Sequence, residues 1–255
     1  MTRILITGAS RGIGRGVAEE LTARGHEVIA TARDLSSLEV TTAAVRLQLD
    51  VEDESSVRAA VEAAGPIDVL VSNAGATVRA PMETVPLAEV EKLFSLNTFG
   101  ALRVAQAVLP GMRQRRSGKL IFVSSIQGRV AIPLIGPYAA SKWALEAIAE
   151  TLAIEVRHFG VSVTVMQPGA VSSGGAERAK SFLDDGNPYR PLLNQLGGFR
   201  SDPVSVEEVA KAVADAIDDA RSPFRIPVGG PATSILAAKK AAPEHEPFVA
   251  ASLEW

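Results

Sequence analysis

Eight residues near the N-terminus, Thr7-Gly8-Ala9-Ser10-Arg11-Gly12-Ile13-Gly14, follow an apolar run and precede a stretch with helical periodicity. Glycines at such a junction permit a sharp turn with positive φ, a close backbone approach to a ligand, and tight packing of helix on sheet. The amino end of the following helix offers N–H groups to phosphate. The spacing Gly-x3-Gly-x-Gly differs from the common G-x-G-x-x-G, and a purely structural turn is the alternative. The position between strand and helix favours phosphate binding, by Gly8, Ser10, Arg11, Gly12, Ile13 and Gly14.

The second predicted strand ends Thr31-Ala32-Arg33, and this end indicates the type of dinucleotide. About 20 residues after the glycines, an acid binds the ribose of NAD, whereas an arginine accommodates the extra phosphate of NADP. Arg33 lies at this distance, and Arg11 lies in the glycine-rich turn, so two guanidinium groups favour NADP. Asp34 keeps NAD open as the alternative, because its carboxylate could hold the ribose or pair with Arg33.

A phenol and an ammonium group lie four residues apart in Tyr138-Ala139-Ala140-Ser141-Lys142. On a helix this spacing places both groups on one face. A phenol with its ordinary pKa of about 10 exchanges protons poorly near neutral pH. We expect the lysine cation, together with the positive nicotinamide of an oxidised cofactor, to lower this pKa and permit acid–base chemistry. Tyr-x3-Lys alone also fits a solvated helix face, so other motifs in the chain are needed to choose between a catalytic and a solvated pair.

The elements that must position these groups alternate along the chain. Short β-branched runs predict strands, and stretches with helical periodicity lie between them. The strands are expected at 4–7, 28–32, 45–49, 69–72, 120–124, 161–166 and 224–228, and the helices at 17–24, 55–64, 87–115, 139–159 and 206–220. This alternation predicts an α/β fold of the Rossmann type, with a doubly wound parallel sheet of about seven strands and helices on both faces. Ligands are then expected at the carboxyl ends of the strands.

One domain spanning residues 1–255 is expected, because no linker, repeat or low-complexity tract interrupts the chain. Residues 174–203 are rich in Gly and Pro and predict an irregular segment. A loop of this length in a compact domain is often a functional lid, and we interpret it as a substrate lid. The Ala-rich tail at 231–255 is expected to be partly helical and has no role that the sequence assigns.

Six motifs in a fixed order resemble the short-chain dehydrogenase/reductase family over nearly the whole chain. They are the glycine-rich turn, Asn73-Ala74-Gly75, Asn97, Ser125, Tyr138 with Lys142, and Pro168-Gly169. The family's spacing between serine and tyrosine selects Ser125, and Ser124 is then a structural residue at the strand end. Two departures are small: Ser72 stands where many members have asparagine, and Ser173 where many have threonine.

The resemblance implies a role for each catalytic residue. Tyr138 would be the general acid for carbonyl reduction and the general base for alcohol oxidation, with Lys142 holding the nicotinamide ribose and lowering the tyrosine pKa. Ser125 would donate a hydrogen bond to the substrate oxygen. Asn97 would anchor a water that passes protons from Lys142 to solvent, or its amide would only satisfy a helix distortion.

The cofactor contacts follow from the motifs and the strand ends. Asp50 would lie near the adenine amine, or would only cap the helix that begins near Glu52. The pocket around Ile126, Pro133, Leu134 and Ile135 has few charges, so an apolar carbonyl or alcohol substrate is expected. Besides the glycine-rich turn and Arg33, the predicted cofactor-binding residues are Asp50, Val51, Asn73, Ala74, Gly75, Tyr138, Lys142, Pro168, Gly169, Val171 and Ser173.

Composition excludes several other classes of function. The 26 basic and 29 acidic residues give a net charge of −3, which disfavours binding to nucleic acid or to an anionic membrane. The chain has no cysteine, its three histidines have no metal-ligand spacing, and no metal site is predicted. Without a signal peptide or a membrane span, a cytoplasmic protein is expected. The two long helices resemble the family's dimer-forming pair, which implies a homodimer or homotetramer. The remaining alternative is a nucleotide-binding regulatory protein without turnover.

Overall fold

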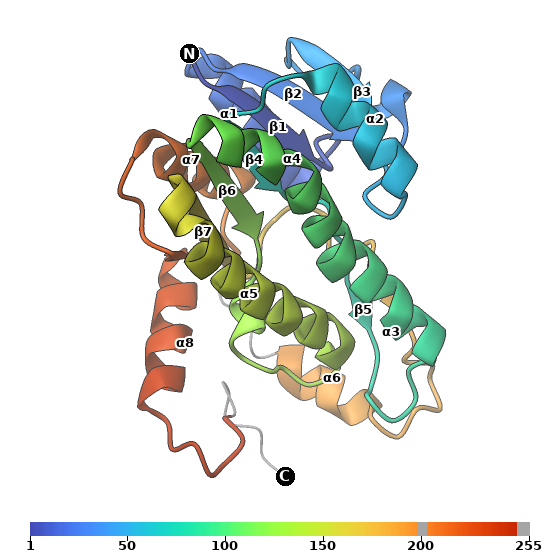
Figure 1. Ribbon diagram of the computed structural model, residues 1–255. Helices are drawn as coiled ribbons and strands as arrows, with labels where there is room; N and C mark the ends of the chain where they lie inside the picture. Colours follow the sequence, from blue (N-terminus) through green and yellow to red (C-terminus); the bar gives the residue numbers. More distant parts are fainter. Residues whose placement is uncertain (198–202, 249–255) are drawn as a thin grey trace.

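The β-branched runs form the strands of a single parallel sheet in the computed structural model, which describes residues 1–197 and 203–248 (Figure 1). Seven strands are hydrogen-bonded in the order β3-β2-β1-β4-β6-β7-β9. Their bounds are β1 (Arg3–Thr7), β2 (Glu27–Ala32), β3 (Val45–Gln48), β4 (Val69–Ser72), β6 (Gly118–Val123), β7 (Val161–Pro168) and β9 (Arg225–Val228). The strand order reverses between β1 and β4, so a crevice for a ligand is expected beyond the carboxyl ends of these two strands.

Helices cover both faces of the sheet because apolar side chains point alternately to its two faces along each strand. The first face packs against α1 (Gly12–Ala23) and α7 (Val206–Asp218). The second packs against α2 (Glu54–Ala64), α4 (Gly100–Arg115) and α5 (Gly136–Val156). Figure 1 shows α4 and α5 on the near side of the sheet and α7 behind it. The predicted doubly wound architecture is therefore confirmed.

The expected helix at 87–115 is present as a continuous helical stretch, with a π-helical turn inside it. It divides into α3 (Leu87–Phe94) and α4, which a π-helical turn at Ser95–Phe99 connects. A π-turn adds a residue to the helical turn and often occurs at functional sites, and Asn97 lies at its centre.

The segment at 174–203 is more regular than its composition predicts. It contains β8 (Lys180–Ser181), which pairs with β5 (Val78–Arg79) in a small second sheet, and it contains α6 (Arg190–Gly197). Residues 198–202 of the predicted lid lie outside the described residues.

The tail begins with α8 (Gly230–Ala241), as its Ala-rich composition indicates. Within the described residues, no helix combines the length and the apolar character needed to cross a membrane.

Candidate active site

The glycine-rich turn connects β1 to α1 at the carboxyl edge of the sheet. Gly8 has a φ of +67°, a conformation that strongly favours glycine. A Cβ on Gly14 would collide with the Gly8 carbonyl and with the Asn73 side chain, so only glycine permits this close packing. Arg11, the N-cap of α1, makes no side-chain cap, and the first N–H groups of the helix have no side-chain acceptor there. These features fit a bound phosphate group.

The ends of β1 and β4 are held together by Thr7 and Asn73. The Thr7 hydroxyl accepts hydrogen bonds from the backbone N–H groups of Asn73 and Ala74, both at 3.0 Å. The Asn73 amide donates to the carbonyls of Thr7 and Gly8, at 3.0 and 3.1 Å. The side chain of Asn73 thus supports the shape of the glycine-rich turn, while Ala74 and Gly75 continue along the crevice.

At the end of β2, the carboxylate of Asp34 is already occupied. It accepts hydrogen bonds from the Ser36 N–H at 3.1 Å and from the Ser36 hydroxyl at 2.9 Å, and it caps the short helix at Leu35–Leu38. The side chains of Arg33 and Arg11 are exposed on this edge. The preference for NADP over NAD stays a prediction.

Asp50 and Val51, which follow the third strand, both make contacts that stabilise the fold. Asp50 accepts a hydrogen bond from the Glu52 N–H at 3.0 Å, while Asp53 is the N-cap of α2. Val51 is buried and packs close to Gly100 at the start of α4. The predicted capping of this helix by Asp50 is therefore wrong, because Asp53 is the N-cap and Asp50 bonds the turn before it.

The end of β7 forms the opposite wall of the crevice. Pro168 is the last residue of this strand, and its carbonyl oxygen lies 3.4 Å from the Ser125 hydroxyl, which donates to it. Further along, Ser173 comes so close to the glycine-rich turn that a Cβ on Gly12 would lie 3.3 Å from its Cβ. Gly169 and Val171 lie between these two points. The structure thus brings the predicted nicotinamide wall against the predicted phosphate turn.

Tyr138 and Lys142 lie in the first two turns of α5, on the face that packs toward the end of β6. The Lys142 Nζ donates to the Val123 carbonyl at 2.9 Å and lies 5.7 Å from the centre of the Tyr138 ring. Ser125 lies two residues after the end of β6, accepts a hydrogen bond from the Gln127 N–H at 3.2 Å, and interacts with the Tyr138 phenol, whose pKa it lowers. The predicted serine, tyrosine and lysine therefore converge on one point.

Burial shifts the pKa values of both Tyr138 and Lys142. Burial raises the pKa of Tyr138 to about 12, and the hydrogen bond with Ser125 opposes that shift only in part. Burial lowers the pKa of Lys142 to about 8, against the opposing charge of Glu146. The raised value results from poor solvation of the phenolate in the protein alone, and the lowering expected with Lys142 and an oxidised cofactor stays a prediction.

Asn97 joins the π-turn to two neighbouring segments. Its Oδ1 accepts from the Ala76 N–H and its Nδ2 donates to the Ala76 carbonyl, both at 2.9 Å. Nδ2 also lies 3.0 Å from the Ser141 hydroxyl on α5. A Cβ on Gly75 would lie 3.1 Å from Asn97 Oδ1 and 3.8 Å from Lys142 Nζ, so the amide and the ammonium lie close to the same residue. A structural role is therefore present, and the water relay stays a prediction.

Sequence reasoning assigned no role to Thr7 or Ser141 within their motifs, and it did not identify Glu146 or Gln167. Ser141 and Glu146 are buried on α5, and the carboxylate of Glu146 accepts a hydrogen bond from the Gln167 amide at 2.8 Å. A signal for Glu146 was present, because Tyr138, Lys142 and Glu146 repeat every four residues and so share one helix face.

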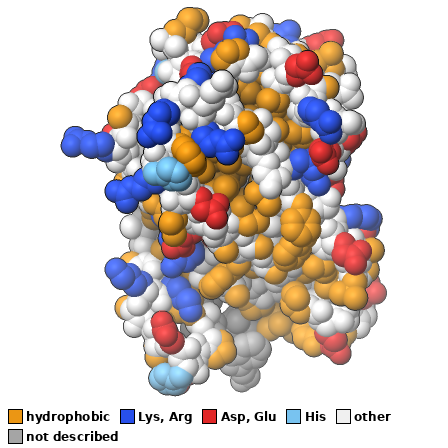
Figure 2. Space-filling model, in the orientation of Figure 1, with side chains coloured by type: hydrophobic (Ala, Val, Ile, Leu, Met, Phe, Trp, Pro, Cys, Tyr) orange, Lys and Arg blue, Asp and Glu red, His pale blue; other side chains and the backbone are white. Residues whose placement is uncertain are grey.

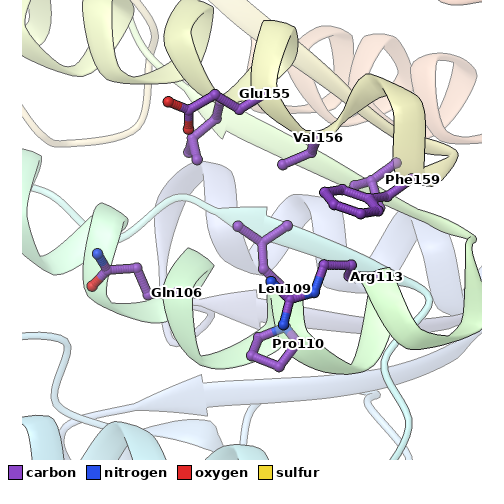
Figure 3. Close-up of a pocket in the computed structure, with 9 residues that line it drawn as sticks. Gln106, Leu109, Pro110, Arg113, Glu155, Val156 and Phe159 are labelled. Carbon is purple, nitrogen blue, oxygen red and sulfur yellow. The ribbon is translucent and has the colours of Figure 1, made fainter.

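A cavity of about 290 Å³ between α4 and α5 lies apart from these residues (Figure 3). It is lined by Gln106, Leu109, Pro110, Arg113, Glu155 and Phe159, among others. Val161, the first residue of β7, also lines it, whereas the site lies at the carboxyl ends of the strands. The cavity is therefore at the opposite edge of the sheet and contains none of the predicted site residues.

Comparisons with known proteins point in the same direction. Residues 2–183 match the family model described as short chain dehydrogenase. The chain is 39% identical to human retinol dehydrogenase 8 over 249 residues, which span 87% of this chain and 79% of that protein. It is 36% identical to a 3-ketodihydrosphingosine reductase of Bacteroides thetaiotaomicron, over 92% of this chain and 90% of that one. The crystal structure of a short chain dehydrogenase from Burkholderia cenocepacia J2315 in complex with NADP superposes with a TM-score of 0.79, at 26% identity, and covers 94% of this chain and 93% of that one.

Proposed function

The chain belongs to the short-chain dehydrogenase family, and on that premise we propose that it reduces an apolar ketone or aldehyde with NADPH, with Tyr138 as the general acid. The observation that carries this proposal is the convergence of Ser125, Tyr138 and Lys142 beside the wall at Pro168. A protein that only bound the nucleotide would have no chemical need for a buried phenol beside an ammonium group.

Each residue of the site has its own role in the proposed reaction. NADPH, when bound, supplies the hydride to the carbonyl carbon. The Ser125 hydroxyl donates a hydrogen bond to the substrate oxygen, where negative charge develops. Tyr138 donates the proton that turns this oxygen into the hydroxyl of the alcohol. The Lys142 cation stabilises the phenolate that remains and holds the nicotinamide ribose.

The proposed general acid, Tyr138, carries its proton throughout the neutral range. Burial raises its pKa to about 12 in the protein alone, so efficient proton donation requires nearby positive charge that lowers this pKa. Oxidation of an alcohol would need the phenolate, which this environment disfavours. Bound oxidised cofactor would add a positive charge and bring the pKa down for the reverse reaction.

The residues at the end of β2 support a preference for NADP. The Asp34 carboxylate is bonded to Ser36, whereas Arg33 and Arg11 are exposed on the edge next to the glycine-rich turn. Guanidinium groups bind phosphate with two parallel hydrogen bonds, so this pair suits the additional phosphate of NADP. A solved relative of the same fold binds NADP.

An apolar substrate is supported by the residues that precede the catalytic helix. Ile126 and Leu134 are buried, with 6% and 5% of their surface exposed. Leu134 has a φ of +65°, and its carbonyl accepts a hydrogen bond from the Ala80 N–H at 2.7 Å, which fixes this wall. The names of two relatives, a retinol dehydrogenase and a 3-ketodihydrosphingosine reductase, refer to long apolar molecules.

The segment at 174–203 is proposed as the substrate lid of this single domain. Its two ends are held together, because Val171 and Val204 form a parallel bridge and the Val204 N–H donates to the Ala170 carbonyl at 2.8 Å. The segment therefore leaves the nicotinamide wall and returns to it, like a loop with closed ends. The Tyr189 hydroxyl donates to Glu83 and connects the segment to the loop before α3.

A homodimer or homotetramer is proposed through the outer face of α3, the π-turn and α5. Leu87, Phe99, Trp143 and Ile154 are exposed there by 77, 52, 46 and 74%. Figure 2 shows hydrophobic side chains gathered on this side of the molecule. An exposed apolar area of this kind often marks a protein interface.

The proposal is tested by following NADPH oxidation over a panel of aldehydes, cyclic and aromatic ketones, steroids, 3-oxoacyl thioesters and long-chain ketones. Tyr138→Phe serves as the blank. We expect turnover with at least one apolar carbonyl, a slower reaction with NADH, and no turnover in the blank. Binding of NADPH without oxidation of any compound in the panel would contradict the reductase and favour a regulatory protein.

A further inference from the structure

Glu146 is a buried carboxylate behind the catalytic residues. Only 3% of its surface is exposed, and it lies on α5 four residues after Lys142 and eight after Tyr138. Residues at this spacing share one helix face, so the carboxylate continues the line formed by the phenol and the ammonium group. Burial of a charge is costly unless it is paired, and the partners of Glu146 show how it is held.

The carboxylate connects α5 to two strands. Its Oε2 accepts from the Arg225 Nε on β9 and its Oε1 from the Gln167 amide on β7, both at 2.8 Å. The next residue after Gln167 is Pro168, whose carbonyl accepts the hydrogen bond of the Ser125 hydroxyl. Glu146 therefore fixes the strand end that meets the catalytic serine.

Glu146 also meets the segment that carries Ser125. This serine caps the short helix at Ile126–Gly128, which packs on α5. A Cβ on Gly128 would lie 2.8 Å from Glu146 Cγ and 2.8 Å from Ser124 Oγ. The segment thus packs directly against the side chain of Glu146, and one carboxylate lies among the three segments that hold Ser125, Tyr138 with Lys142, and Pro168.

Glu146 and its neighbour Glu150 share one guanidinium group. Arg225 also binds Glu150, with its Nη2 at 2.7 Å from that carboxylate, so one guanidinium serves two acids. Arg129 faces the exposed Glu150 from the neighbouring segment, and Lys142 is the cation nearest to Glu146 on its own helix. The Lys142 ammonium group therefore adds a further positive charge one helical turn from the buried carboxylate.

We propose that Glu146 is a positioning residue of the reductase: its carboxylate holds α5 against the segments of Ser125 and Pro168 and places a negative charge one helical turn from Lys142. This inference rests on the proposed function. The carboxylate acts through other residues and touches neither substrate nor cofactor. A purely structural buried ion pair would stabilise the fold without influencing the charge of Lys142.

The test compares pH profiles of kcat in the full-length protein. Burial lowers the pKa of Lys142 to about 8, and the charge of Glu146 opposes this shift. Activity is expected to fall as the pH rises through this value, because Lys142 then loses its proton. Glu146→Gln removes the opposing charge, so the falling limb should move to lower pH by on the order of one unit.

Two further variants separate charge from packing. Glu146→Asp keeps the charge and should leave the limb in place, with a lower kcat because the shorter side chain fits poorly. Glu150→Gln is the matched control, because it removes an acid from the same arginine but its side chain is 55% exposed. In this control the pH at which kcat falls should stay where it is in the wild-type protein.

A second readout does not depend on turnover. The affinity for NADPH, measured by fluorescence, should show the same limb, because Lys142 holds the ribose in the proposed function. If no carbonyl is reduced by the wild-type protein but this limb moves in Glu146→Gln, the reductase proposal fails and the influence of Glu146 on Lys142 stands. An unchanged limb in folded Glu146→Gln, or an equal shift in Glu150→Gln, would overturn the inference.

Discussion

The two faces of the sheet differ in how many polar side chains they bury. The face under α1 and α7 is mainly an apolar cluster, with Arg24 bonded to Asp215 at 2.8 Å and to Asp218 at 3.0 Å at its rim. Its buried Lys119, near the start of β6, donates to the Ala216 carbonyl of α7 at 2.6 Å. The face under α4 and α5 buries polar side chains near its carboxyl edge, namely Asn97, Ser141, Lys142, Glu146 and Gln167. Buried polar groups cost free energy unless they are satisfied, so their concentration on one face marks where the chemistry is organised.

This difference assigns separate tasks to the two faces. The first face supplies stability, because apolar burial needs no exact orientation of individual groups. The second has to hold a phenol, a hydroxyl and an ammonium group within a narrow geometry. Substitutions on the two faces should therefore affect different measurements, and the predictions below compare them.

Removal of the serine hydroxyl should have the largest of these effects. Ser125→Ala deletes the donor to the substrate oxygen, and we expect kcat to fall by roughly 10²- to 10³-fold with NADPH affinity nearly unchanged. Ser124→Ala is the matched control, because its buried hydroxyl has no hydrogen-bond partner within residues 1–197 and 203–248. Steady-state kinetics of both variants measure this. Equal losses of kcat in the two would contradict the assignment of Ser125.

Core truncations on opposite faces should separate stability from catalysis. Leu21 on α1 and Leu145 on α5 are both fully buried, and truncation of either to alanine should cost roughly 2–5 kcal/mol of unfolding free energy. Only Leu145→Ala should also lower kcat, by roughly tenfold, because it lies next to the catalytic turns of α5.

Urea denaturation and kinetics of the folded fraction measure the two quantities for both variants. A kcat that falls equally in Leu21→Ala would show that the two faces do not divide the tasks.

The smallest effect is expected at the carboxyl edge of the sheet, at the end of β2. Arg33→Ala should weaken NADPH binding by roughly tenfold and leave NADH binding unchanged, because only NADPH carries the extra phosphate. Fluorescence titrations with both nucleotides measure this change. If NADH binds the wild-type protein as tightly as NADPH, the preference for NADP is wrong.

The sequence predicts the local features of this molecule better than the features that depend on tertiary contacts. Strands such as Val69–Ser72 and the glycine-rich turn are local patterns, so their type and order could be predicted from the residues alone. The family resemblance further identified Ser125, Tyr138 and Lys142 as one group, and the structure brings them together.

Features that depend on tertiary packing could not be predicted in the same way. The π-turn at Ser95–Phe99 forms where Asn97 bonds residue 76 and α5, and these contacts are distant in sequence. The pair of β5 and β8 is too short to have a periodic pattern. The raised pKa of Tyr138 results from burial, which no spacing rule indicates.

The most direct test of the central claim uses the two tyrosines of the chain. NADPH binding and NADPH oxidation should be measured together for the wild-type protein, Tyr138→Phe and Tyr189→Phe, with the best carbonyl of the panel. The account predicts that Tyr138→Phe binds NADPH like the wild type but loses roughly 10²- to 10⁴-fold in kcat, as loss of a general acid requires. Tyr189→Phe should retain most of its kcat, because Tyr189 lies in the proposed lid. A Tyr138→Phe variant that still reduces the carbonyl at the wild-type rate would contradict the account.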